Sequence, residues 1–355
     1  MRVLFYTRKD YLINSGGDTI QLLKTKEYLE RLNVKIDIVN DEFYSSNNYD
    51  LIHIFNCLPI YHVERFIKRN AGKKIIISPI YWDLTEYKEK VLSKVSVRRR
   101  VLNYIDDKKN IFLQKLKNNV YKFFNNDFEE KFRFCLNSAN IILPNSQREK
   151  KFFDEKYGLN EKTFVVPNGI DVNIKPANYE NMKIKYKLPD KFVLSVGRIE
   201  YRKNQLMLLQ CAQKLKLNVI LVGSINHKEK KYYQKLKRYN FLHIPYLNQN
   251  ELFSLYNKSM MHVLPSWFET PGLATLEAAY NGAQIITTDR GCTKEYFDDF
   301  AFYCSPDNIS SLEMAIIELL EQPKDIAKLK EKILNNYTWE VAAKKTLEAY
   351  NIVLK

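Results

Sequence analysis

The stretch MHVLPSWFETPGLATLEAAYNGAQIITTD, residues 261–289, decides the fold of this chain. It begins with a short apolar run, passes through a Pro-Gly step into a run rich in leucine and alanine, and ends in a β-branched run. Short apolar runs of this kind predict buried strands, and the run between them predicts a helix. Two strands joined by a helix form the repeating unit of a parallel sheet.

The same alternation extends over the whole chain. In the first half, the predicted strands are residues 3–7, 34–39, 51–55, 74–78, 140–144 and 163–167. In the second half, they are residues 192–196, 218–223, 241–245, 261–265, 284–288 and 300–304. Apolar strands that alternate with amphipathic helices indicate an α/β fold, and the two similar halves indicate two parallel-sheet domains.

The domain boundaries follow from a change in pattern. Residues 167–191 contain three prolines and show no sustained hydrophobic period. We therefore expect a first domain over 1–168, a linker over 169–190 and a second domain over 191–337. The last stretch, 338–355, has a helical amphipathic pattern and is expected to pack back toward the first domain.

Composition excludes several classes of protein. The chain has 355 residues, of which 45% are hydrophobic, so it is long enough and apolar enough to fold as two globular domains. It has no run of 18 apolar residues and no export-type leader, and its five cysteines are widely spread without a C-x-x-C pair. We expect a cytoplasmic protein without a disulfide framework or a zinc site.

The net charge of +15 indicates an anionic partner. Residues 88–134 hold 13 Lys or Arg against 6 Asp or Glu, interleaved with apolar side chains. This pattern fits a basic amphipathic helix on the inner face of an anionic membrane, and it fits a solvated helix face equally well. No helix-turn-helix, zinc spacing or aromatic RNA-binding pattern accompanies the charge, so we expect no nucleic-acid partner.

A Gly-Gly pair precedes the first predicted helix, in NSGGDT, residues 14–19. Gly16 and Gly17 would let backbone N–H groups approach an anion at the helix N-terminus. The spacing is not that of a dinucleotide fingerprint, and a simple turn capped by Asp18 explains the same residues.

A basic turn follows the strand that opens the second half, in GRIEYRKN, residues 197–204. It places Arg198 and Lys203 at the carboxyl end of a parallel strand, where α/β folds bind ligands. A planar guanidinium and a mobile ammonium together suit a diphosphate. The alternative is a solvated basic turn.

The opening stretch carries two carboxylates, Glu269 and Glu277. Pro271 and Gly272 indicate that the helix begins near Gly272, which leaves Glu269 in a loop and Glu277 in the second helical turn. Free N–H groups at residues 272–274 and the helix dipole favour an anion between the two acids. A sugar nucleotide has this layout of diol, diphosphate and sugar hydroxyls, whereas a glycosidase would need both acids to face one bond.

These residues resemble a known family, the retaining glycosyltransferases of family 4. The matching segments are VVPNGID (165–171), SVGRIEYRKN (195–204), LVGS (221–224), LPSWFETPGLATLEAAYNGAQIITTD (264–289) and GCTKEYF (291–297). FETPGLATLE fits the E-x7-E signature of that family, and NSGGDT and NIILPNS (140–146) are weaker matches. The resemblance implies a GT-B fold, in which two Rossmann-like parallel-sheet domains face each other across a cleft.

The resemblance also implies roles for single residues. Arg198 and Lys203 would neutralise the leaving diphosphate, Glu269 would contact hydroxyls of the transferred sugar, and Glu277 would bind the ribose diol. The other implied donor-binding residues act through backbone N–H groups and are Gly16, Gly17, Gly272, Leu273 and Ala274. The implied catalytic residues are Glu269, Arg198 and Lys203.

The implied reaction transfers a sugar, with retention, from a UDP- or GDP-linked donor to a glycan or lipid-linked acceptor in bacterial polysaccharide or lipopolysaccharide synthesis. No cofactor or metal is expected, since the chain has no Asp-x-Asp motif. An epimerase of nucleotide sugars or a phosphorylase on the same fold is the alternative.

The acceptor side departs from the family pattern. Members often carry a histidine after the fourth strand, whereas IIISPIYWDLTEY, residues 75–87, contains none. Tyr81, Trp82 or Asp83 is expected to take its place, or His53 from the strand 51–55.

Overall fold

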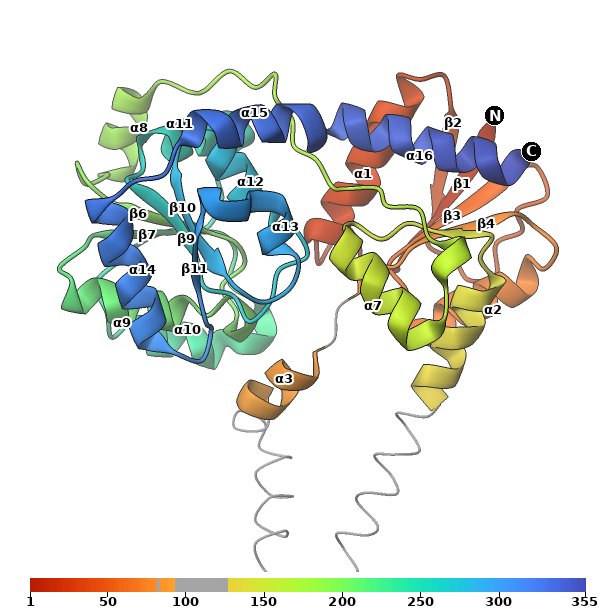
Figure 1. Cartoon of the computed structure of the whole chain (residues 1–355), viewed down its shortest axis with the longest axis horizontal. Coiled ribbons are helices and arrows are strands. Elements are labelled where there is room, and N and C mark those ends of the chain that lie inside the picture. The colour runs from red at the N-terminus through yellow and green to blue at the C-terminus, as the bar shows by residue number, and fades with distance from the viewer. Residues whose placement is uncertain (82–83, 93–126) are drawn as a thin grey trace, which may run out of the picture. The chain divides into compact units, whose positions relative to one another are not determined.

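The chain forms two compact units in a computed structural model that describes residues 1–81, 84–92 and 127–355. The first unit comprises Met1–Val166 and Ala343–Lys355, and the second comprises Pro167–Ala342. Each unit contains one parallel sheet with helices packed against it (Figure 1). The two parallel sheets predicted from the alternating pattern are therefore confirmed.

The sheet of the first unit has five parallel strands in the order β2-β1-β3-β4-β5. They are β1 (Arg2–Tyr6), β2 (Lys35–Val39), β3 (Leu51–Phe55), β4 (Ile75–Ser78) and β5 (Ile141–Ile142). The strand order reverses direction between β1 and β3. In open parallel sheets, ligands bind at the carboxyl ends of the strands beside such a reversal.

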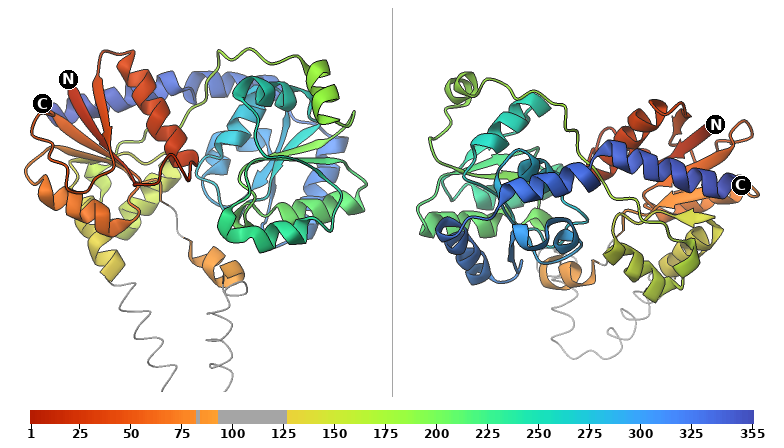
Figure 2. Two further views of the ribbon diagram at one scale, coloured as in Figure 1. Left: turned by 180° about the vertical axis from the view of Figure 1, so that it is seen from behind. Right: turned by 45° about the horizontal axis from the view of Figure 1, so that its top comes forward.

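Helices cover both faces of this sheet. The helical segments of this unit are α1 (Gly17–Glu30), α2 (Ile60–Arg69), α3 (Thr85–Tyr87), a π-helical turn (Lys88–Leu92), a helix over 127–138, α7 (Gln147–Tyr157), a 3-10 turn (Asn160–Lys162) and α16 (Trp339–Leu354), of which α3 and the π-helical turn lie away from the sheet (Figure 1). Strand residues such as Leu4 and Ile54 pack in one core with Phe66 of α2 and Phe153 of α7. The segment of α16 from residue 343 onward belongs to this unit, and both termini lie on it (Figure 2).

The sheet of the second unit has six parallel strands in the order β11-β10-β9-β6-β7-β8. They are β6 (Val193–Val196), β7 (Val219–Val222), β8 (Leu242–Ile244), β9 (Met261–Leu264), β10 (Gln284–Thr288) and β11 (Phe302–Cys304). Here the strand order reverses between β6 and β9. The stretch that opened the sequence analysis supplies β9, the helix α12 and β10.

The helices of the second unit pack on both faces of the sheet. They are α8 (Tyr179–Tyr186), α9 (Gln205–Lys214), α10 (Lys230–Leu236), α11 (Gln249–Lys258), α12 (Leu273–Tyr280), α13 (Thr293–Phe297), α14 (Ile309–Glu321) and α15 (Ile326–Asn336), with 3-10 turns at Tyr201–Lys203, His227–Glu229 and Asp298–Phe300. Val193 and Met261 of the strands share a core with Leu208 of α9 and Ile316 of α14. Burial on both faces explains why most residues of these strands are apolar.

One predicted strand, residues 163–167, is not formed. This segment makes an isolated bridge between Thr163 and Ile142. Phe164 and Val166 donate backbone hydrogen bonds to the carbonyls of Ile142 and Pro144. Pro144 has no N–H to donate in return, so the ladder stops there.

The expected linker also differs in detail. The units divide between Val166 and Pro167, and α8 forms inside the range 169–190. Asn178 caps this helix by accepting a hydrogen bond from the N–H of Asn181, and Met182 of the helix is buried. A polar capping residue and one buried methionine stabilise a short helix that no hydrophobic period reveals.

Most of the basic stretch 88–134 lies outside the described residues, which exclude 93–126. Among the described residues, no helix is long and apolar enough to cross a lipid bilayer.

Candidate active site

Two loops meet at the carboxyl edge of the second unit's sheet, where the strand order reverses. β6 pairs directly with β9. The chain leaves β6 into the turn 197–204 and leaves β9 into the loop 265–272, which leads to α12. The reversal therefore brings together Lys203 and Glu269, which are 66 positions apart in sequence.

Lys203 and Glu269 form a direct ion pair at this edge. The Lys203 ammonium donates to Glu269 Oε1 at 2.5 Å, and the two side chains are only 13% and 7% exposed. The sequence predicted a phosphate-binding cation and a sugar-binding carboxylate as separate groups. The structure places them in contact, so each holds the other in position.

The Glu269 carboxylate is kept ionised by its neighbours. Burial raises the pKa of Glu269, but the Lys203 ammonium and the Arg202 guanidinium outweigh this effect and hold the pKa below its ordinary value. The backbone of Glu269 is fixed as well, because its carbonyl accepts a hydrogen bond from the N–H of Cys292 at 2.8 Å. This carboxylate is thus a fixed acceptor of hydrogen bonds.

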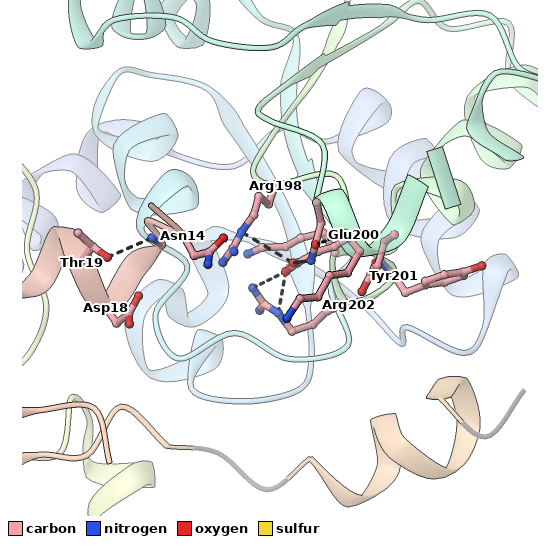
Figure 3. A network of polar contacts seen from close by, with 12 residues as sticks. Asn14, Asp18, Thr19, Arg198, Glu200, Tyr201 and Arg202 are labelled. Atoms are coloured by element: carbon pink, nitrogen blue, oxygen red, sulfur yellow. Dashed lines mark hydrogen bonds and ion pairs between the residues drawn. The ribbon is translucent and has the colours of Figure 1, made fainter. Parts of the chain in front are cut away.

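The sequence analysis did not single out Glu200 or Arg202, which organise the basic turn. Arg202 Nη2 lies 3.0 Å from Glu200 Oε1, and the amide of Asn226 donates to Glu200 Oε2 at 3.2 Å. The Arg202 carbonyl accepts from the N–H of Trp267 at 2.8 Å, which ties the turn to the loop of Glu269. Glu200 is the one acidic residue in GRIEYRKN, and an acid among three cations could have indicated this network from the sequence (Figure 3).

Arg198 is the most open cation of the turn. Its Nε lies 3.8 Å from Glu200 Oε2, and its side chain is 34% exposed. Figure 3 shows Arg198 and Arg202 on either side of Glu200. A guanidinium at this distance from a carboxylate keeps donors for a second anion.

Glu277 lies in the second turn of α12, as the sequence predicted. Its Oε2 accepts a hydrogen bond from the hydroxyl of Tyr256 on α11 at 3.2 Å. Burial, followed by the charge of Glu277, raises the pKa of Tyr256 well above its usual range. Tyr256 therefore stays protonated and donates to the half-buried carboxylate.

The start of α12 has the geometry of an anion site. Gly272 is the N-cap residue with φ 75° and ψ 71°, and its carbonyl accepts the first helical bonds from Thr275 and Leu276. Leu273 and Ala274 open the helix, so their N–H groups point out of its N-terminus. These N–H groups lie in the chain between Glu269 and Glu277.

In the first unit, Gly16 caps α1 and Gly17 is its first residue. The preceding loop is fixed by Arg8, which the sequence analysis did not single out. Arg8 Nε lies 2.7 Å from Asp18 Oδ2, its Nη1 lies 2.7 Å from Asp10 Oδ1, and its Nη2 donates to the carbonyl of Asn14. Asp18, labelled in Figure 3, thus pairs with Arg8 at the start of α1.

His53 does not reach a ligand surface. Its side chain is 1% exposed; Nδ1 lies 2.6 Å from the Tyr350 hydroxyl of α16 and Nε2 lies 2.9 Å from Ser78 Oγ. Burial lowers the pKa of His53 to about 3, so the ring is neutral. This ring joins a strand to the C-terminal helix, and the acceptor role considered for His53 stays a prediction without support from these contacts.

The other acceptor-side candidates contribute little to a described site. Tyr81 packs its ring 4.8 Å from the ring of Phe132 and is half-buried. Trp82 and Asp83 lie outside the described residues. Over 1–81, 84–92 and 127–355, no three His, Cys, Asp or Glu side chains are grouped so that they could hold a metal ion.

The second unit shares its sequence pattern with a known family. Residues 179–336 match the family model described as glycosyl transferases group 1. This group 1 segment contains the basic turn, Glu269, Glu277 and the whole of α12.

Curated relatives are similar to about half of this chain. An uncharacterized glycosyltransferase of Methanocaldococcus jannaschii is 24% identical over 55% of this chain and 55% of its own length. The N-acetylgalactosamine-N,N'-diacetylbacillosaminyl-diphospho-undecaprenol 4-alpha-N-acetylgalactosaminyltransferase of Campylobacter jejuni is 26% identical over 52% of each chain. The chain spans about half the length of the curated relatives it matches.

The likeness of fold extends over both units. Sucrose-phosphate synthase from Thermosynechococcus elongatus superposes with a TM-score of 0.77 at 14% identity, over 99% of each chain. With its two parallel sheets, the chain has the GT-B fold that the resemblance implied.

Proposed function

We propose that this protein is a retaining glycosyltransferase of family 4. It transfers a sugar from a UDP- or GDP-linked donor to a glycan or lipid-linked acceptor, and its E-x7-E acids are Glu269 and Glu277. The proposal includes the synthesis of bacterial surface polysaccharide or lipopolysaccharide at the inner face of the cell membrane. It includes no metal ion and assigns the binding of the leaving group to cationic side chains.

The contact between Lys203 and Glu269 carries this proposal. A diphosphate needs cations, and the turn 197–204 and the adjoining loop present three cationic side chains against two buried carboxylates, Glu200 and Glu269. Charge-assisted hydrogen bonds of this kind bind phosphate more strongly than neutral donors do. Arg198 supplies the open guanidinium, and the start of α12 supplies N–H groups.

Donor binding would exchange the partners of this ion pair. Phosphate oxygens compete with Glu269 for the Lys203 ammonium, and a buried carboxylate that loses its cation is unstable unless new donors reach it. The hydroxyl groups of the donor sugar are such donors. We infer that Glu269 discriminates between donor sugars because, without the matching hydroxyl, its only cationic neighbour among the described residues would be the Arg202 guanidinium, 3.9 Å away.

The reaction then needs no enzyme nucleophile. The bond between the anomeric carbon and the diphosphate oxygen breaks, and the electron pair leaves with the diphosphate. The acceptor oxygen bonds to the same face of the carbon, and its proton passes to the departing phosphate. Arg198 and Lys203 stabilise the charge that develops on the leaving group, which lowers the barrier because they are already in place.

The decisive experiment is calorimetric titration with UDP and with GDP, in the presence of a chelator, of the wild type and of Glu277→Ala. The proposal predicts that one nucleotide binds the wild type and that the mutation weakens it. Sugar transfer with the anomeric configuration read by NMR then tests retention and separates a transferase from an epimerase. If neither nucleotide binds the wild type, or if the product is inverted, the proposal is wrong.

A further inference from the structure

A buried carboxylate in the first unit contacts a partly exposed histidine. Glu42 follows β2 and is only 3% exposed. Its Oε1 lies 3.0 Å from Nδ1 of His62, and its Oε2 lies 2.8 Å from the ammonium of Lys9. Lys9 follows β1, and His62 lies in the first turn of α2, which follows β3. Three separate segments thus converge on one acid.

The position of this group is that of a ligand site. Lys9, Glu42 and His62 all follow the carboxyl ends of strands in the first unit's sheet. Two of those strands, β1 and β3, are the neighbours between which the strand order reverses. Ligands of open parallel sheets bind at this point.

The hydrogen bonds fix how the imidazole is presented. A carboxylate only accepts hydrogen bonds, so Nδ1 of His62 carries the proton in this contact. In the neutral ring, Nε2 is then an acceptor. The His62 side chain is 36% exposed, and among the described residues no hydrogen bond involves its Nε2. The carboxylate therefore orients a ring nitrogen that remains able to accept a bond from a ligand.

The charges favour an uncharged partner. The Lys9 ammonium balances the Glu42 carboxylate when His62 is neutral. The Lys9 ammonium and a backbone N–H lower the pKa of Glu42 to about 2, so the carboxylate persists at neutral pH. A group whose charges balance, with one ring nitrogen able to accept a hydrogen bond, suits a hydroxyl more than an anion.

Exposed apolar side chains adjoin the group in sequence. Phe43 follows Glu42 and is 60% exposed, and Leu58, four residues before His62, is 41% exposed. A sugar ring presents apolar C–H faces and polar hydroxyl edges. It can use such side chains and a hydrogen-bond acceptor together.

We propose that His62, oriented by Glu42, binds a hydroxyl of the glycan acceptor in the first unit. The inference rests on the proposed glycosyltransferase function and names the chemistry of its second substrate. His62 contacts that substrate, and Glu42 is a positioning residue. The alternative is that the group of Lys9, Glu42 and His62 only ties three loops together.

Histidine-selective labelling for NMR separates these possibilities. The chain has five histidines, so the ring signals are few and His62→Gln assigns one of them. The probes are methyl α-mannopyranoside, methyl α-glucopyranoside, methyl β-galactopyranoside and the methyl β-glycoside of N-acetylglucosamine. At least one probe is expected to shift the His62 signal in a saturable manner while the buried His53 signal stays in place.

The variants sharpen the test. His62→Gln is expected to weaken binding of that glycoside about tenfold, the loss of one hydrogen bond. Glu42→Gln removes the charge that orients the ring and is expected to weaken binding in the same direction by a smaller factor. The exposed His227 of the second unit provides the control, and His227→Gln should leave binding unchanged. A purely structural group would instead give lower melting temperatures with unchanged glycoside affinity, and that result overturns the proposal.

Nucleotide titration of the same samples distinguishes this proposal from the broader one. If UDP or GDP binds but no probe moves the His62 signal, the acceptor site is wrong and the donor site stands. If a glycoside binds at His62 but neither nucleotide binds, the proposed transfer fails while a glycan site remains. Unchanged glycoside affinity in His62→Gln rejects the role of His62 directly.

Discussion

A Cβ atom placed on Gly291 would lie 2.0 Å from the carbonyl oxygen of Glu269. The two residues form an isolated parallel bridge, and Gly291 has a φ of +85°. No other residue type fits this close approach without moving the backbone. The position of the Glu269 backbone therefore depends on a glycine in the loop after β10.

Gly291→Ala should displace Glu269 and lower stability. Strain in the left-handed region alone costs about 1–2 kcal/mol, and the overlap with the Glu269 carbonyl adds to it. Gly282→Ala is the matched control, because Gly282 has a φ of +92° with no atom within 4 Å of the added Cβ. Urea unfolding should show the larger loss for Gly291→Ala, together with loss of transfer; equal losses would contradict the role of the close approach.

Substitution of Glu277 in α12 and of Glu269 in the preceding loop should affect different steps. Glu277→Ala should weaken nucleotide binding about tenfold or more, because it removes the carboxylate that is proposed to accept hydrogen bonds from the ribose. Glu269→Ala should lower the transfer rate by roughly a hundredfold and change nucleotide affinity far less. Calorimetry and initial rates measure both, with the exposed Glu331→Ala as control. A similar loss of nucleotide affinity in both variants would refute the division of roles.

The stability contributed by Glu42 should vanish in acid. Its folded-state pKa of about 2 lies below the ordinary 4.5, so the unfolded chain binds the additional proton as the pH falls. The contribution is fully present above about pH 4.5 and is lost as the pH falls toward 2. The free energy of unfolding of the wild type minus that of Glu42→Gln should shrink over this range. A difference that is constant with pH would show that the carboxylate is not ionised preferentially in the folded state.

Tyr350→Phe should loosen the C-terminal helix. The change removes the hydroxyl that lies 2.6 Å from His53 Nδ1 and leaves that buried nitrogen without a partner. An unsatisfied buried polar group costs about 1–3 kcal/mol. Thermal unfolding measures the loss, and Tyr246→Phe serves as control because Tyr246 is 78% exposed. Equal melting temperatures for the two variants would argue against the buried bond as a source of stability.

Local patterns predicted much of the fold and part of the site. Continuous apolar runs identified eleven strands because parallel strands are buried on both faces. The Pro-Gly step predicted where α12 begins, since its signal lies in neighbouring residues. The remaining run, residues 163–167, does not form a strand, because its pairing depends on the neighbouring strand and Pro144 has no N–H to donate.

Contacts between residues far apart in sequence could not be predicted from these local patterns. The ion pair of Lys203 with Glu269 requires the order of β6 and β9 in the sheet, which no local period encodes. All five residues of the strand that carries His53 are buried, so its burial follows from the apolar run, whereas its contact with Tyr350 depends on the packing of α16, which no local pattern encodes. Arg8 and His62 likewise acquire their partners only through the folding of separate loops.

The helix α16 has a consequence for synthesis of the chain. Its residues from 343 onward complete the first unit, whose remaining residues are 1–166. On the ribosome, residues 1–166 emerge long before residues 343–355, which cover them. The apolar surface that α16 covers therefore stays exposed while the second unit is synthesised. N-terminal domains usually fold first during translation. Here the unit made first is the unit finished last.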